Sequence, residues 1–98
     1  MSGYSVHRLK ASGQRVVRLQ YPRLDTGATV LVAPLYPAEK ALELKIVTPR
    51  VEVDGSEFLV ATHLLAAVQQ KDIGPPEATL AAYEYVIANA INRLFFGI

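Results

Sequence analysis

The chain has 98 residues, of which 51% are hydrophobic and 19% are charged, and it contains no cysteine. This length fits one domain over residues 1–98, and the composition excludes a disordered chain, a disulfide scaffold and a cysteine-ligated metal site. Because few residues are charged, we expect a partner, most simply a second copy of the chain, to cover part of the apolar surface. No segment has the pattern of a signal peptide or of a membrane-spanning helix, so the expected location is the cytoplasm.

The first predicted element is a hairpin with a basic surface. Apolar segments at residues 4–9 and 15–20 flank a loop that contains a glycine, which is typical of a β-hairpin. Residues 1–24 hold five basic and no acidic side chains, a sum of +5, whereas the remainder holds five basic and nine acidic side chains, a sum of −4. This surface is either a solvated hairpin or a docking site for an acidic partner. The candidate docking residues are Arg8, Lys10, Arg15 and Arg18.

The middle of the chain predicts further strands. Residues 28–36 form an apolar run that is typical of a buried strand. Pro34 lacks a backbone donor, so we expect this strand to end, bulge or lie at an edge there. Residues 37–42 allow one helical turn, and Asp54-Gly55 predicts a tight hairpin turn. Residues 61–73 fit either a helical turn or a short strand.

The last quarter of the chain predicts one long helix. The segment 74–77 has the composition of a helix start, and Gly97 fits a left-handed cap, which gives a helix of roughly 20 residues. About five antiparallel strands followed by this helix predict a mainly β fold, a small barrel with a C-terminal α-helix. The stripe expected to face the core or a second copy consists of Leu80, Tyr83, Ile87, Ala90, Ile91 and Leu94.

The opposite face of the predicted helix carries residues that are typical of contact surfaces. Tyr85, Asn89, Asn92 and Phe96 are spaced four, three and four residues apart, so they lie on one side of the helix. Aromatic and amide side chains of this kind are enriched where proteins bind one another. The apolar ending at residues 95–98 fits either the chain's own core or a pocket in another protein.

The ending of the sequence resembles that of the CcdB toxins of CcdA–CcdB toxin–antitoxin systems. The family pattern of Ile-x-Asn-Ala-Ile-Asn, two further residues, an aromatic pair and Gly-Ile corresponds to residues 87–98. Less specific similarity covers Leu24-Asp25-Thr26, Val32-Ala33-Pro34-Leu35 and the hairpin at residues 51–55. The similarity therefore extends over most of the chain, although only the C-terminal dozen residues are specific to the family.

This resemblance implies a fold, an activity and a set of partners. CcdB proteins are homodimers of small SH3-like barrels, a fold that they share with MazF, and they are not enzymes. They poison DNA gyrase by trapping its cleaved-DNA complex, and a CcdA antitoxin neutralises them. The resemblance implies no cofactor, no metal, no membrane and no nucleic acid bound directly. The gyrase-binding residues that it implies are Leu24, Asn92, Phe95, Phe96, Gly97 and Ile98.

Three positions depart from the usual family pattern. Phe96 stands where the best-known members have Trp, and it offers less apolar area and no indole N–H. Arg93 and Arg23 stand where apolar residues are usual. All three departures fall in or beside the segments that are expected to contact gyrase.

Two enzymatic alternatives rest on shorter signals. The segment 24–28 matches the aspartic protease signature, and in a retroviral-type homodimer Asp25 would be the catalytic residue. The chain lacks the apolar strand before this residue and the glycine-rich flap after it, so a turn in which Asp25 bonds its own backbone competes with that interpretation. A MazF-like endoribonuclease would need a basic catalytic cluster, for which His7 in the basic hairpin is a candidate.

Overall fold

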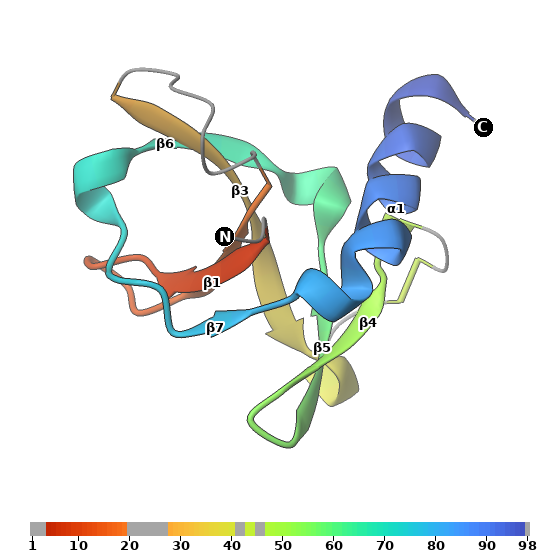
Figure 1. Ribbon diagram of the computed structural model, residues 1–98, viewed down its shortest axis with the longest axis horizontal. Helices are drawn as coiled ribbons and strands as arrows, with labels where there is room; N and C mark the ends of the chain where they lie inside the picture. The colour runs from red at the N-terminus through yellow and green to blue at the C-terminus, as the bar shows by residue number, and fades with distance from the viewer. Residues whose placement is uncertain (1–3, 20–27, 41–42, 45–46, 98) are drawn as a thin grey trace.

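The computed structural model describes residues 4–19, 28–40, 43–44 and 47–97, and in these residues it forms a nearly closed β-barrel with one α-helix (Figure 1). The strands are β1 (Ser5–Arg8), β2 (Arg15–Arg18), β3 (Thr29–Pro37), β4 (Arg50–Val53), β5 (Ser56–Val60), β6 (Ala66–Gln69) and β7 (Ala78–Thr79). The helical elements are the 3₁₀ turns η1 (Ala38–Lys40), η3 (Thr62–Leu64), η4 (Gln70–Asp72) and η5 (Ala81–Tyr83) and the α-helix α1 (Glu84–Phe96). The predicted fold class, a small mainly β barrel with a C-terminal helix, is confirmed.

Strand β3 organises the barrel because it pairs with three other strands. The order of the sheet is β4-β5-β3-β2-β1-β7, every pair is antiparallel, and β6 pairs with β3 away from this path. Residues 29–32 of β3 pair with β6, residues 32–34 with β2, and residues 35–37 with β5. A bridge between Leu9 and Ile73 joins the end of β1 to the segment after η4, which nearly closes the ring seen in Figure 1.

Both predicted hairpins are present in the structure. Strands β1 and β2 pair across the glycine-containing loop. Asp54 and Gly55 have φ values of 53° and 80°, so both adopt the left-handed conformation that a two-residue hairpin turn requires. Pro34 neither ends β3 nor lies at an edge: the strand continues through it and changes partner from β2 to β5 at that point. Its carbonyl oxygen accepts a hydrogen bond from the Ala61 N–H at 2.9 Å.

The predicted start of the long helix at residues 74–77 is wrong. The Glu77 N–H donates to the Val6 carbonyl oxygen at 2.7 Å and the Leu80 N–H donates to the Tyr4 carbonyl oxygen at 2.9 Å, so this segment adds β7 to the edge of β1. Consecutive prolines hold the backbone before them extended, and unpaired carbonyl groups of β1 supply the acceptors. Helix α1 therefore has 13 residues.

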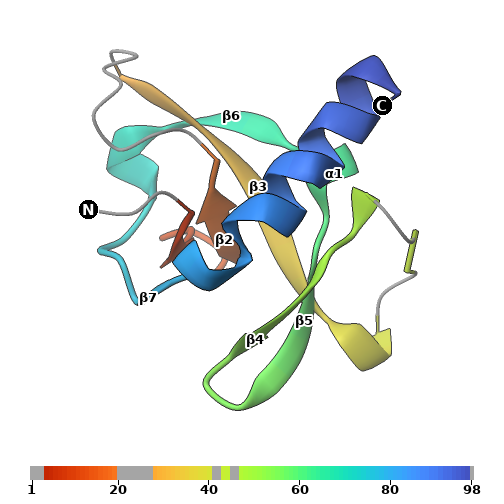
Figure 2. The same ribbon diagram turned by 45° about the vertical axis from the view of Figure 1, so that its right-hand side comes forward.

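Helix α1 packs across the sheet with one face and leaves its end clear of the barrel (Figure 2). The main core contains side chains of β1 to β5 together with Leu80 and Ile87, which are 1% and 0% exposed. A smaller core around Val30, Val32 and Ile73 fills the ring on the other side of β3. The burial predicted for the inner stripe is confirmed: Leu80, Ile87 and Ala90 are buried, and Tyr83, Ile91 and Leu94 are half-buried. Leu80 and Tyr83 lie before α1, however, and not on the helix as predicted. Among the described residues no helix is both long and apolar enough to cross a membrane.

Candidate binding surface

The last turn of α1 exposes two aromatic side chains. Phe95 and Phe96 are 59% and 71% exposed. Their ring centroids lie 6.5 Å apart, and the planes of the two rings form an angle of 55°. Asn92, one turn earlier, and Gly97, directly after the helix, are also exposed. We call Asn92, Phe95, Phe96 and Gly97 the helix-end surface. Apolar rings that stand in water in this way are typical of surfaces that another molecule covers.

Local sequence chemistry explains why these residues lie on the outside. The inner positions of α1 are taken by Ile87 and Ala90, which pack into the barrel, so the helical period turns Asn92 and Phe96 outward. Gly97 has a φ of 71°, and its N–H donates to the Arg93 carbonyl oxygen at 3.0 Å, which ends the helix in the predicted left-handed cap. The aromatic pair therefore does not fill the chain's own core.

The structure brings together four of the six residues predicted to bind gyrase. Asn92, Phe95, Phe96 and Gly97 share the end of one helix. Leu24 and Ile98 lie outside the described residues, as do the neighbouring Arg23 and the aspartate of the protease signature.

The predicted docking residues of the basic hairpin are divided between its two faces. Arg8 and Arg15 are direct partners across β1 and β2, so their side chains share one face. Arg18 lies three residues beyond Arg15 and therefore on the other face of the hairpin. Its Nε is a buried donor without a hydrogen-bond partner among the described residues. Lys10 is exposed at the hairpin loop.

Two of these arginines are paired with carboxylates. The Nε of Arg8 donates to both carboxylate oxygens of Glu77 at 3.0 Å. The guanidinium of Arg15 lies 3.6 Å from the Asp54 carboxylate and 5.3 Å from the centre of the Phe58 ring. Exposed ion pairs contribute at most about 1 kcal/mol, so a partner with its own carboxylates can replace them. The surface is less positive than the sequence alone predicts.

His7 is a structural residue. It is 5% exposed, its Nε2 lies 2.7 Å from the Ser5 hydroxyl, and its Nδ1 lies 2.9 Å from the Gly74 carbonyl oxygen. The carbonyl can only accept, so Nδ1 donates to it, and Nε2 is engaged with the Ser5 hydroxyl. A catalytic base must reach its substrate, so this arrangement does not favour the MazF-like alternative. Within the described residues no cluster of His, Asp or Glu is placed to hold a metal ion.

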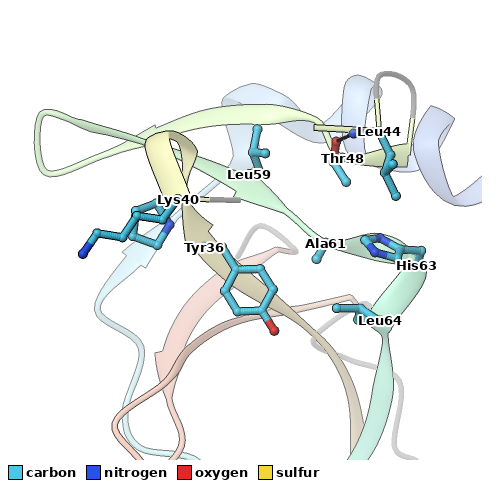
Figure 3. Close-up of a pocket in the computed structure, with 9 residues that line it drawn as sticks. Tyr36, Lys40, Leu44, Thr48, Leu59, Ala61, His63 and Leu64 are labelled. Atoms are coloured by element: carbon cyan, nitrogen blue, oxygen red, sulfur yellow. Dashed lines mark hydrogen bonds between the residues drawn. The ribbon is translucent and has the colours of Figure 1, made fainter. Parts of the chain in front are cut away.

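A cleft that the sequence did not indicate opens between the end of β3, β5 and η3 (Figure 3). Its volume is about 470 Å³. Buried Leu59, Ala61 and Thr48 form its floor, and Leu44 and Leu64, which are 39% and 48% exposed, flank its mouth. The lining residues are Tyr36, Pro37, Lys40, Leu44, Thr48, Leu59, Ala61, His63 and Leu64. The cleft is chiefly apolar, which fits binding better than catalysis.

An ion-pair cluster lies beside this cleft. Arg50 on β4 donates to Glu43 at 2.9 Å and to Glu57 on β5 at 3.3 Å. The hydrogen bond to Glu43 is the main reason why the pKa of Arg50 is raised, and the charge of Glu43 and the contact with Glu57 act in the same direction. Arginine is cationic throughout the accessible pH range, so this cluster ties two strands and a loop together.

Comparison with known proteins identifies a family. A protein-family model described as "CcdB protein" matches residues 3–97, which is nearly the whole chain. A comparison with individual curated proteins gives no match. The family match covers the barrel, the helix and the helix-end surface together.

Proposed function

Because the chain belongs to the CcdB family of toxins from toxin–antitoxin systems, we propose that it poisons DNA gyrase through its helix-end surface. The acting species is a cytoplasmic homodimer that presents two helix ends to the breakage-reunion subunit of gyrase. It is a binding protein and not an enzyme. The single observation that carries the proposal is the exposure of Phe95 and Phe96 at the end of a well-anchored helix.

The poison acts by selecting one state of its target. The aromatic pair enters a pocket that gyrase opens only while its DNA is cut, and binding stabilises that state in proportion to the difference in affinity between the open and closed states. A helix whose inner face is buried holds the rings in place before binding, which lowers the entropic cost of association. Phe96 stands at the position where Trp is usual in the family. In the proposed contact with gyrase, it supplies apolar area and no hydrogen-bond donor.

The second partner is a CcdA-like antitoxin with a disordered acidic tail. The tail docks on the face of the basic hairpin that carries Arg8 and Arg15, together with Lys10 at the loop, and it folds as it binds. Arg18, on the opposite face, is not part of this contact. Because Arg8 and Arg15 already have carboxylate partners, Glu77 and Asp54, the acidic tail must displace these contacts.

Removal of Gly97 and Ile98 tests the role of the helix end. We expect the truncated chain to keep its circular dichroism spectrum and thermal midpoint, because the core residues of α1 lie earlier in the helix, and to lose growth arrest when it is expressed without antitoxin. The exposed substitution Gln70→Ala, on η4, is the matched control and should remain toxic. Growth arrest by a natively folded truncated chain would show that the helix end is not the active surface.

A gyrase variant that resists CcdB toxins tests the target. Cells with ordinary gyrase should accumulate DNA covalently linked to gyrase after expression of the chain, and cells with the resistant gyrase should not. Equal growth arrest in both strains would point to a different target. The protease alternative through Asp25 is not favoured by the family match, and it predicts cleavage that Asp25→Asn abolishes and no linked DNA.

A further inference from the structure

The exposed surface of α1 does not stop at its last turn. Tyr85, in the first turn of the helix, is 89% exposed, the largest value among the exposed large hydrophobic residues of the described chain, and Val86 beside it is 43% exposed. A shallow hollow on this side of the helix is lined by Tyr85, Val86, Ala88, Asn89 and Asn92. Asn92 belongs both to this hollow and to the helix-end surface.

The exposed residues form one straight ridge. At 100° per residue, Tyr85, Asn89, Asn92 and Phe96 fall within a sector of about 60°, and at 1.5 Å per residue the ridge is about 16 Å long. We call these four residues the outer ridge. Asn92 and Phe96 are its C-terminal half, and Tyr85 and Asn89 are its N-terminal half. A surface that contacts Phe96 and Asn92 and continues along the helix axis meets Asn89 and then Tyr85.

The chemistry of the outer ridge is that of a protein contact and not of a solvated helix face. The charged residues of α1 are Glu84 and Arg93, and neither belongs to the ridge. Outward faces of helices usually carry charged side chains, whereas rigid aromatic rings and amides are enriched in contact surfaces. The ridge offers no positive charge, so it does not fit an acidic antitoxin tail, for which the basic hairpin is the complementary surface.

We propose that the target subunit of gyrase contacts the whole outer ridge, and that Tyr85 is a specificity-determining residue for that target. This inference rests on the proposed function, because it assigns to the same partner the half of the ridge that continues from Asn92. Two features carry it: the ridge keeps one helical face, and it remains uncharged throughout. A second copy of the chain and the antitoxin are the other possible occupants, and the experiment separates them.

The test measures binding of full-length variants to the purified breakage-reunion subunit of gyrase. Tyr85→Ala should raise the Kd roughly tenfold, which is typical of an aromatic contact residue. Tyr85→Phe keeps the ring and should bind like the unaltered chain. Because the Tyr85 side chain is almost fully exposed, neither change should move the thermal midpoint. Gln70→Ala is the control on another surface, and Phe96→Ala is the reference variant for the proposed function.

The possible results separate the two proposals. If Phe96→Ala weakens gyrase binding and Tyr85→Ala does not, the inference about the ridge is wrong and the proposed function stands. If both variants bind gyrase normally, the proposed function fails as well. If Tyr85→Ala leaves gyrase binding intact but dissociates the dimer in sedimentation, or weakens only antitoxin binding, then a second copy or the antitoxin occupies this half of the ridge and the inference is overturned.

Discussion

Tyr4 occupies a strained position at the start of the described chain. Its φ of 61° lies in the left-handed region, which a non-glycine residue adopts only when its surroundings hold it there. The Leu80 N–H donates to its carbonyl oxygen, and its side chain packs against the main core. Burial raises the pKa of the Tyr4 phenol above its ordinary value of 10.0, and the nearby charge of Glu84 raises it further. The folded chain therefore favours the neutral phenol.

This pKa shift predicts a loss of stability at alkaline pH. Because the folded-state pKa of Tyr4 is above the unfolded value, its contribution to stability is fully present below about pH 10 and is lost as the pH rises through the folded-state pKa. Tyr4→Phe keeps the ring and removes the ionisable group. We expect urea unfolding to give similar stabilities for the two chains at pH 8, and a larger decrease for the unaltered chain between pH 9 and 11. Parallel curves would contradict this assignment.

Among the elements, the turn from β7 into η5 depends on a threonine. The Thr79 hydroxyl oxygen accepts a hydrogen bond from the Ala81 N–H at 3.2 Å, directly after β7, where the chain turns into η5. Thr79→Val has nearly the same shape but no acceptor, so we expect it to lower the free energy of unfolding by about 1 kcal/mol, as for other lost capping contacts. Thr79→Ser keeps the hydroxyl and should be closer to the unaltered chain. Equal losses for both variants in urea titrations would assign the effect to packing.

Local chemistry decides which elements could be predicted from the sequence. The Asp54-Gly55 turn, the Gly97 cap and the outward direction of Asn92 and Phe96 depend on residues close together in the chain, and all three predictions are confirmed. The predicted start of the helix is wrong because the backbone N–H groups of Glu77 and Leu80 donate to carbonyl oxygens more than 70 positions earlier in the sequence.

Contacts between distant residues also explain what the sequence missed in the candidate site. Glu77 neutralises Arg8 across 69 positions, so counting charges along the chain overstated the basic surface. The phenol oxygen of Tyr83 accepts from the Glu52 N–H at 3.1 Å, which fixes the start of the helix on the edge strand β4. No periodic pattern marks either pair, because each depends on the assembled barrel.

For the whole molecule, the distribution of charge predicts how the antitoxin binds. The net charge is only +1, so any attraction of an acidic tail comes from the local charge of the basic hairpin. We expect the Kd for the antitoxin tail to rise as salt increases from about 0.05 to 0.5 M, over which screening becomes strong. Lys10→Ala should weaken binding and reduce the salt dependence, whereas Lys40→Ala, on η1, serves as the matched control. Affinity that does not change with salt would exclude the hairpin as an electrostatic docking site.

Because Phe95 and Phe96 are exposed, the stability of the fold and the contact proposed for the helix end depend on different residues. Buried core residues such as Ile87 stabilise the folded chain, whereas the exposed rings contribute little to its free energy of unfolding. On the proposed function, substitutions at the helix end change target binding without a penalty in folding. A random library of this chain selected for survival should yield two classes of escape variant: insoluble proteins changed in the core, and soluble, abundant proteins changed at the end of α1.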